Sequence, residues 1–285
     1  MSAPGLTLLA PAKLNLFLHI TGRRADGYHE LQTLFQLLDY GDTMNFIPRK
    51  DDTIVLHIKP GPFSDGIPRQ DNLVIRAIDA LRPLRLDLRD GIEISLEKRI
   101  PPGGGLGGGS ANAAMTLLAL NSLWELHLDP GRLAQIGLGL GADVPLFLHG
   151  HSAWAEGVGE RLQDLELARR WYLVATPRCQ VNTGLVFSQE NLTRNSPTIK
   201  IADFLAAGTR NDCESVTRTL YPEVDAALNC LSRYGSPRMS GTGASVFLDF
   251  PDEASAAAVL AELPGHLHGF VARGVNTLEQ KLAGA

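Results

Sequence analysis

A run of glycines between residues 101 and 112 constrains this chain more than any other feature. The segment reads PPGGGLGGGSAN, and six of the seven residues from 103 to 109 are glycine. It lies between a segment with strand-like alternation, residues 92–98, and an Ala- and Leu-rich segment, residues 110–123, that predicts a helix. Without Cβ atoms the backbone N–H groups can approach an anion closely, and the helix adds its own unpaired N–H groups and dipole. The sequence therefore predicts a phosphate-binding loop, whose residues are Pro101, Pro102, Gly103, Gly104, Gly105, Leu106, Gly107, Gly108, Gly109, Ser110 and Ala111.

Two familiar phosphate-binding patterns do not identify the ligand of this loop. The Walker pattern needs a Gly-Lys pair, which occurs nowhere in the chain. Gly103, Gly105 and Gly108 match the dinucleotide pattern G-x-G-x-x-G, but the acid about 20 residues further on, Glu125, follows a predicted helix instead of a strand. A looser match within 137–142 lies in a helix-like segment. The loop alone therefore leaves its ligand open.

A lysine and an aspartate are the candidates for chemistry beside this loop. Residues 13–20 alternate in hydropathy, which predicts a strand with one buried face and places Lys13 and Asn15 on the opposite face. Asp143 follows a helix predicted over 130–140, and an acid at a helix C-terminus is electrostatically unfavourable, which hints at a function. A phosphoryl-transfer enzyme needs an acid and a cation near the acceptor hydroxyl. The alternatives are that Lys13 is a solvated lysine on a strand and that Asp143 is an ordinary acid in the loop after a helix.

The remaining segments predict an α+β chain. Asp71 is expected to cap a helix that begins at Asn72, and Asp212 to cap a helix that reaches Leu231. Further along, the pattern predicts strands over 171–175, 245–250 and 269–272 and a helix over 252–263. With about 150 residues per domain, 285 residues make two domains, and we place the boundary near residue 155.

Composition excludes several classes of protein. The net charge is −5 and no long basic stripe occurs, so we expect no nucleic-acid partner. The three cysteines, Cys179, Cys213 and Cys230, are odd in number and widely spaced, which argues against a disulfide framework and a cysteine metal site. No apolar run approaches the roughly 18 residues of a membrane span. Ala10-Pro11-Ala12 is not preceded by Lys or Arg as a signal peptide requires, so we expect a cytoplasmic protein without membrane contact.

Four motifs in this order resemble the GHMP kinase superfamily, which is named for galactose, homoserine, mevalonate and phosphomevalonate kinases. They are the segments 11–16 (PAKLNL), 101–112, 140–145 (LGADVP) and 240–244 (SGTGA). Residues 103–110, together with 26–33 (DGYHELQT) and 156–160 (EGVGE), resemble the branch of the superfamily that phosphorylates 4-diphosphocytidyl-2-C-methyl-D-erythritol. The resemblance extends from residue 11 to about residue 276 and so covers nearly the whole chain.

The resemblance implies a two-domain α+β GHMP kinase fold with the active site in the cleft between an ATP-binding domain, 1–155, and a substrate-binding domain, 156–285. It implies transfer of phosphate from ATP, with Mg²⁺, to the 2-hydroxyl of this cytidyl substrate in the non-mevalonate route to isoprenoid precursors. Asp143 would be the general base and Lys13 would orient it and the hydroxyl, while residues 101–111 would bind the ATP phosphates. No residue is assigned as a protein metal ligand.

The same resemblance implies a substrate site. Asn15 would hydrogen-bond the substrate, and the cytidyl end would lie near Tyr28, His29 and Phe187, where an aromatic face can stack on a pyrimidine. A second glycine turn would face the phosphates or the substrate, and it consists of Gly241, Thr242 and Gly243. For Phe187 the alternative is core packing, for Tyr28 and His29 an exposed turn, and for the glycine turn a tight connection before a strand.

Three further positions bear on nucleotide binding. Lys98, which ends the strand before the loop, and Asn72 are possible nucleotide contacts. The family has a second serine where this chain has Ala111. We expect Ser110 and the backbone N–H groups to suffice for phosphate binding, because such loops bind phosphate mainly through the main chain. If the missing hydroxyl normally touches Mg²⁺ or phosphate, the affinity for metal or ATP would be weaker.

Two other functions remain open at this point. One is a mevalonate- or homoserine-type kinase of the same superfamily, whose acceptor has no base to stack. The other is a catalytically inactive nucleotide-binding sensor, which would have no chemical need for both Lys13 and Asp143. For the cytidyl kinase we expect a small-molecule partner, the cytidyl substrate, and a monomer or weak homodimer.

Overall fold

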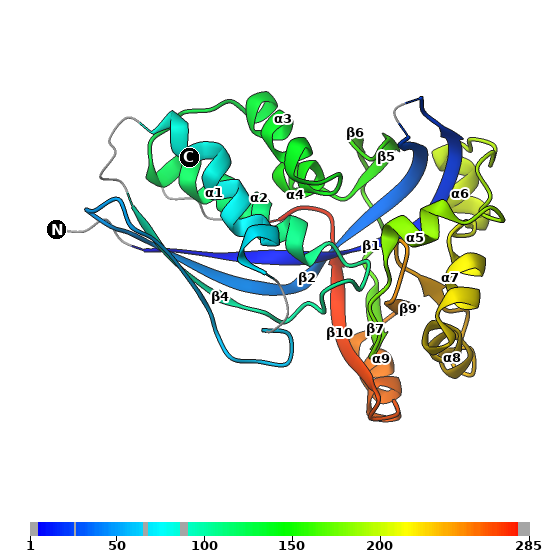
Figure 1. The fold of residues 1–285 in the computed structure, drawn as a ribbon. Helices are drawn as coiled ribbons and strands as arrows, with labels where there is room; N and C mark the ends of the chain where they lie inside the picture. The colour runs from blue at the N-terminus through cyan, green and yellow to red at the C-terminus, as the bar shows by residue number, and fades with distance from the viewer. Residues whose placement is uncertain (1–4, 26, 65–67, 86–90, 279–285) are drawn as a thin grey trace.

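The computed structural model describes residues 5–25, 27–64, 68–85 and 91–278, and within them one ten-stranded sheet joins both halves of the chain (Figure 1). The strands are β1 (Leu6–Arg23), β2 (His29–Pro48), β3 (Ile54–Ile58), β4 (Ile92–Glu97), β5 (Ala153–Gly157), β6 (Arg161–Asp164), β7 (Trp171–Pro177), β8 (Arg238–Met239), β9 (Val246–Phe250) and β10 (Leu267–Val275). The helices are α1 (Leu73–Leu81), α2 (Gly108–Leu123), α3 (Pro130–Leu140), α4 (Val144–His149), α5 (Thr183–Ser188), α6 (Ile201–Ala207), α7 (Glu214–Leu220), α8 (Pro222–Leu231) and α9 (Glu253–Ala261). Short 3₁₀ turns occupy Arg69–Asp71 and Arg82–Leu84. The predicted α+β class is confirmed.

The sheet runs in the order β3-β4-β2-β10-β7-β9-β8, with β1 and β5 on β2 and β6 on β5. The last strand, β10, pairs antiparallel with both β7 and β2 and thereby connects the two halves. Figure 1 shows α1, α2 and α4 at the β2 and β4 end and α7 and α8 at the other end. The boundary predicted near residue 155 falls inside β5, which pairs with β2, and it stays a prediction.

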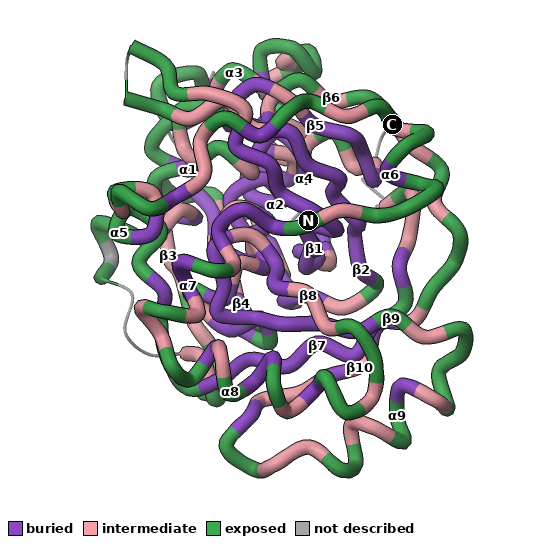
Figure 2. Tube along the Cα trace, turned by 90° about the vertical axis from the view of Figure 1, so that its right-hand side faces the viewer, coloured by how far each residue is buried: buried purple, intermediate pink, exposed green. Residues whose placement is uncertain are grey.

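The strand predicted over 13–20 is the middle of β1, which forms a long antiparallel pair with β2. The prediction of a single buried face is wrong, because every residue from 11 to 20 is buried. The edge of β1 that faces away from β2 receives other segments: the amide of Lys13 donates to Leu106 O at 3.0 Å, and the amide of Leu18 donates to Arg210 O at 3.3 Å. Figure 2 shows this buried trace along β1, β2 and β7, whereas α9 is largely exposed.

Two predicted helix starts are also corrected. Asn72, not Asp71, caps α1, because its Oδ1 accepts the amide of Val74 at 3.0 Å. Asp212 caps no helix; it accepts the amide of Ile20 at 2.8 Å and so ties β1 to the second half of the chain. The single helix expected after it is divided into α7 and α8, since Pro222 has no N–H to continue the first one.

Other local predictions are confirmed. Asp129 caps α3 by accepting the amide of Arg132 at 3.0 Å, and Asp252 caps α9 by accepting the amide of Ser255 at 2.8 Å. The expected strands at 92–98, 171–175, 245–250 and 269–272 correspond to β4, β7, β9 and β10. In the part of the chain that the structure describes, no helix is both long enough and apolar enough to cross a membrane.

Candidate active site

The glycine loop leads from β4 into α2 and packs against the second glycine turn. Gly103, Gly105 and Gly107 have φ angles of 67°, 72° and 73°, which residues with a Cβ rarely adopt. The hydroxyl of Ser240 donates to Gly105 O at 2.9 Å, and a Cβ on Gly105 would lie 2.2 Å from Ser240 O. Glycine at 105 is therefore required both by backbone conformation and by the close approach of the two turns.

A cavity of about 320 Å³ runs along this loop. Every residue from Pro101 to Ser110 lines it, as do Asn72 and Lys98. Ala111 differs, because its side chain is fully buried in the core between the sheet and the helices of the first half. Its amide donates to Gly107 O at 2.8 Å within α2. The position at which this chain departs from the family pattern thus points its side chain into the core.

A buried ion pair that sequence reasoning missed lies behind the loop. Asp42, at the middle of β2, is fully buried and its Oδ2 pairs with Lys98 Nζ. Its Oδ1 accepts the amides of Arg99 at 2.7 Å and Ile100 at 2.8 Å, directly before the loop. Asn112, in α2, donates to Asp42 Oδ2 at 2.9 Å and accepts from Lys98 Nζ at 3.1 Å. The group of Asp42, Lys98 and Asn112 therefore fixes both ends of the glycine loop.

On the other side of the loop, Lys13 and Asp143 form a second pair. Lys13 Nζ lies 3.3 Å from Asp143 Oδ2 and 2.5 Å from Asn15 Oδ1, and Asn15 Nδ2 donates to Thr33 Oγ1 at 3.0 Å. The Lys13 side chain is 4% exposed and that of Asp143 is 32% exposed. Lys13, Asn15 and Asp143 line a second cavity, of about 400 Å³. The structure brings Asp143 to Lys13 and Asn15, which lie about 130 residues earlier in the sequence.

Helix α3 occupies the predicted residues 130–140, but Asp143 belongs to the start of the next helix. Helix α3 ends at Leu140, and Asp143 takes the N-cap position of α4. The argument from an unfavourable helix C-terminus is therefore wrong, because the dipole of α4 presents its positive end to this carboxylate. A proline at the second position of α4 is compatible with this arrangement, since the first turn of a helix does not need its N–H.

The two cavities meet at the end of the loop. Gly105 and Ser110 line both the cavity along the glycine loop and the cavity that contains Lys13 and Asp143. A group bound on the loop would therefore lie next to the lysine–aspartate pair. Within the described residues no group of three or more His, Cys, Asp and Glu side chains is arranged to hold a metal ion.

A third cavity, of about 440 Å³, continues from the second and contains the predicted aromatic residues. Tyr28, His29 and Phe187 all line it, and the rings of His29 and Phe187 stack with centroids 4.9 Å apart at 26°. Tyr28 is 62% exposed, and Phe187 lines the second cavity as well. Asp26, the first residue of the segment 26–33, lies outside the described residues.

The second glycine turn closes one wall of the second cavity. Gly241 and Thr242 line it, with φ of 58° at Gly241. Gly243 instead faces the interior, where a Cβ would lie 3.0 Å from the sulfur of Met239. Asn211 Nδ2 donates to Gly241 O at 2.7 Å and holds the turn from behind.

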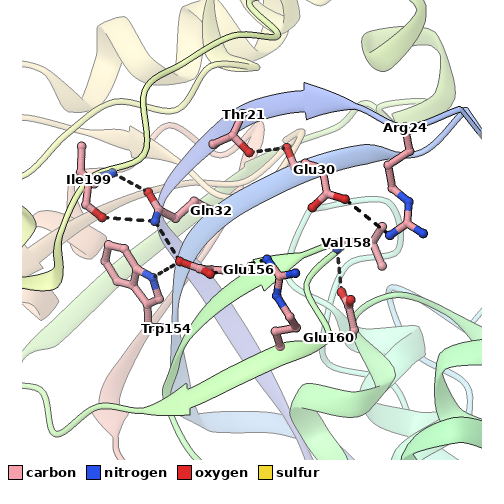
Figure 3. A network of polar contacts seen from close by, with 10 residues as sticks. Thr21, Arg24, Glu30, Gln32, Trp154, Glu156, Val158, Glu160 and Ile199 are labelled. Atoms are coloured by element: carbon pink, nitrogen blue, oxygen red, sulfur yellow. Dashed lines mark hydrogen bonds and ion pairs between the residues drawn. The ribbon is translucent and has the colours of Figure 1, made fainter.

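The turn at 156–160 forms the opposite wall, and a polar network supports it (Figure 3). Val158 lines both the second and the third cavity, and its amide donates to Glu160 Oε2 at 2.6 Å. Gln32 on β2 donates to Glu156 Oε1 at 3.1 Å and accepts the amide of Ile199 at 2.9 Å. Figure 3 shows Gln32 between β5 and the segment before α6, so this glutamine joins the two halves beside the site.

Comparison with known proteins gives consistent matches over nearly the whole chain. The model of the GHMP kinases N terminal domain matches residues 72–151, and the model GHMP kinases C terminal matches residues 192–269. A 4-diphosphocytidyl-2-C-methyl-D-erythritol kinase from Marinobacter nauticus is 52% identical over 95% of this chain and 94% of its own length. One of the same name from Pseudomonas aeruginosa (strain UCBPP-PA14) is 51% identical over 97% of both chains.

Solved structures agree. A crystal structure of 4-(cytidine 5'-diphospho)-2C-methyl-D-erythritol kinase superimposes with a TM-score of 0.77 at 34% identity, covering 94% of this chain and 99% of the other. The mevalonate kinase of Methanococcus jannaschii superimposes with a TM-score of 0.69 over 96% of this chain and 99% of the other. At 16% identity this second match shows a shared fold alone.

Proposed function

The chain belongs to the GHMP kinases, within the family of 4-diphosphocytidyl-2-C-methyl-D-erythritol kinases, and from this we propose that it phosphorylates the 2-hydroxyl of 4-diphosphocytidyl-2-C-methyl-D-erythritol with ATP. The observation that carries the proposal is the pair of cavities that share Gly105 and Ser110. This arrangement puts the glycine loop, where we expect the ATP phosphates to bind, directly beside a lysine–aspartate pair. The product would serve the non-mevalonate route to isoprenoid precursors.

In the proposed reaction Asp143 accepts the proton of the acceptor hydroxyl. The hydroxyl oxygen then bonds to the γ-phosphorus of ATP, the bond from this phosphorus to the oxygen that bridges it to the β-phosphate breaks, and ADP leaves. Lys13 Nζ, at 3.3 Å from Asp143 Oδ2, orients the base and stabilises negative charge on the hydroxyl oxygen. The glycine loop holds the phosphates through its N–H groups and the N-terminus of α2.

Mg²⁺ fits the oxygen-rich junction of the two cavities. Its preferred ligands are hard oxygens, usually phosphate oxygens, waters and one or two carboxylates. Ser110 Oγ and the partly exposed Asp143 carboxylate would hold the ion, since Ser110 lines both cavities and Asp143 lines the second. When bound, the ion neutralises charge that develops on the transferred group.

The third cavity suits the cytidyl end of the substrate. Tyr28 and Phe187 offer aromatic faces for stacking on a pyrimidine, and Asn15, Gly241 and Thr242 line the path toward Asp143. A mevalonate or homoserine acceptor would leave this aromatic cavity unused, which favours the cytidyl substrate. The cytoplasmic location, the monomeric or weakly dimeric state, the absence of a nucleic-acid partner and the domains 1–155 and 156–285 stay predictions.

A coupled ADP-release assay tests the proposal. The enzyme is given ATP and Mg²⁺ with 4-diphosphocytidyl-2-C-methyl-D-erythritol, mevalonate or homoserine in parallel. We expect turnover with the cytidyl substrate alone. Turnover only with mevalonate or homoserine would overturn the substrate assignment, and ATP binding without turnover of any acceptor would favour the sensor.

The aromatic site has its own test. Because base–aromatic stacking contributes about 1–3 kcal/mol per base, Phe187→Ala and Tyr28→Ala should each raise KM for the cytidyl substrate by about tenfold and leave KM for ATP unchanged. Leu205→Ala, an exposed apolar residue of α6, is the control and should leave both values unchanged. An unaltered KM for the cytidyl substrate in both aromatic variants would contradict this placement.

A further inference from the structure

Arg194 lies in the segment between α5 and α6, and its guanidinium makes four hydrogen bonds, two of them to residues that line the third cavity. Nε donates to His29 Nε2 at 3.2 Å, and one terminal nitrogen donates to Phe187 O at 2.7 Å and to Gln189 O at 2.8 Å. The other terminal nitrogen donates to Leu192 O at 3.2 Å. One half-buried side chain therefore binds both an aromatic residue of β2 and the end of α5.

The bond to His29 determines where the proton of this imidazole lies. Guanidinium has only donors and carries its charge at any physiological pH, so the ring nitrogen that it contacts must be an acceptor. His29 Nε2 is thus unprotonated, and the single ring proton is on Nδ1. Burial of the ring, followed by the charges of Arg194 and Arg23, lowers the pKa of His29, which agrees with a neutral ring.

The remaining N–H of His29 is available to a ligand. Across residues 5–25, 27–64, 68–85 and 91–278, no hydrogen bond joins a protein group to His29 Nδ1. The ring stacks on Phe187 and the residue lines the third cavity beside Tyr28. Holding the carbonyl of Phe187 fixes the backbone of its stacking partner at the same time.

We propose that Arg194 is a positioning residue that selects the neutral Nδ1–H tautomer of His29 and fixes Phe187 beside it, so that the cavity presents one ring donor next to one aromatic face. That combination matches a flat base with a hydrogen-bond acceptor on its edge, as a pyrimidine with a ring carbonyl has. The inference deepens the proposed function and rests on it for the identity of the base.

Arg194→Lys tests the role kinetically, because lysine keeps the charge but loses the planar fork that reaches several acceptors. Hydrogen bonds from charged groups are worth about 1.5–3 kcal/mol, so we expect KM for the cytidyl substrate to rise about tenfold to a hundredfold. We expect kcat to stay within about threefold and KM for ATP within about twofold, because the loop and the Lys13–Asp143 pair are untouched. Arg218→Lys is the matched control: its guanidinium is held by Asp225 at 2.6 Å and Asn229 at 3.1 Å, and both KM values should be unchanged.

Two further measurements separate positioning from a general loss of structure. Imidazole ¹⁵N NMR of the enzyme without substrate should show His29 as the Nδ1–H tautomer in the wild type and as an Nε2–H-containing mixture in Arg194→Lys. In a His29→Ala background, Arg194→Lys should raise KM by no more than about threefold, since part of its effect acts through the missing ring.

Three results would overturn the inference: an Nε2–H tautomer in the wild type, an unchanged KM for the cytidyl substrate in Arg194→Lys, or the full KM effect in the His29→Ala background. Failure of the proposed function is recognised separately. It would appear as absence of wild-type turnover with the cytidyl substrate, whereas the tautomer measurement needs no substrate.

Discussion

Two lysine–aspartate pairs flank the glycine loop, and their surroundings differ sharply. Lys98 and Asp42 are 6% and 0% exposed, and the two oxygens of Asp42 accept two backbone amides and the amide of Asn112 besides the lysine. Lys13 is equally buried, but its partner Asp143 is 32% exposed and borders a cavity. The same two residue types thus form a closed pair behind the loop and an open pair in front of it.

The difference shows that burial determines whether the carboxylate of a charged pair can contact a substrate. A fully bonded carboxylate has no lone pair left for a substrate, so Asp42 itself can only hold structure. A partly exposed carboxylate beside a buried ammonium retains room for an acceptor hydroxyl. We therefore assign loop geometry to the closed pair and propose proton transfer for the open one.

The largest expected effect is that of Asp143→Asn on catalysis. Removal of a general base typically lowers a rate by about 10²–10⁴-fold, and we expect kcat to fall about 10³-fold. KM for ATP should stay within about twofold, and the free energy of unfolding within about 1 kcal/mol, because the Asp143 side chain is partly exposed and Lys13 keeps its bond to Asn15 Oδ1. Coupled ADP release and urea unfolding measure these quantities. Residual kcat above about a tenth of the wild-type value would remove Asp143 from the proposed role.

Asp42→Asn should act on stability instead. Breaking a buried ion pair leaves an uncompensated charge, here Lys98, and costs about 3–5 kcal/mol in the free energy of unfolding. The control is Asp39→Asn, a partly exposed aspartate of the same strand that bonds the amide and side chain of Arg273, with an expected loss below about 1 kcal/mol. Equal urea midpoints for the two variants would mean that the closed pair does not stabilise the fold.

Lys13→Met should lower kcat by about 10²-fold, because the positive charge that orients Asp143 and stabilises the hydroxyl oxygen is lost. Methionine keeps an apolar stem near Phe35, whose ring centroid lies 5.3 Å from the ammonium, so the fold should persist. The exposed Lys50→Met serves as control and should retain full kcat. A normal kcat in Lys13→Met would mean that the open pair, like the closed pair, has only a structural role.

The smallest effect is expected for Ala111→Ser, which restores the serine of the family pattern. Since the side chain faces the core, KM for ATP should change by no more than about twofold and stability by less than about 1 kcal/mol. Ser110→Ala, the neighbouring position that lines both cavities, should raise KM for ATP severalfold in the same assay. A tenfold change of that KM in Ala111→Ser would show that position 111 reaches the nucleotide.

Local sequence signals predicted those parts of the fold that depend on local chemistry. Asp129 and Asp252 were recognised as helix caps, and β4, β7, β9 and β10 were found as strands. The signals missed β2, because its 20 residues mix polar and apolar side chains without the regular alternation of a half-buried strand. They also misjudged Asp212, which bonds the amide of Ile20 in β1 instead of capping a helix. No short-range pattern contains such a contact between residues 192 positions apart.

By itself, the sequence determined the α+β class, the glycine loop that we propose binds phosphate and the set of residues that we propose for the site, since these depend on residue type, spacing and motifs. Only the tertiary structure decided that Asp42 closes around Lys98, that Asp143 lies at the start of α4, that Ala111 faces the core and that Arg194 holds His29. The reason is physical: hydrogen-bond partners and exposure are set by segments that meet in space. The role of a charged side chain therefore depends on which residues surround it in the folded chain.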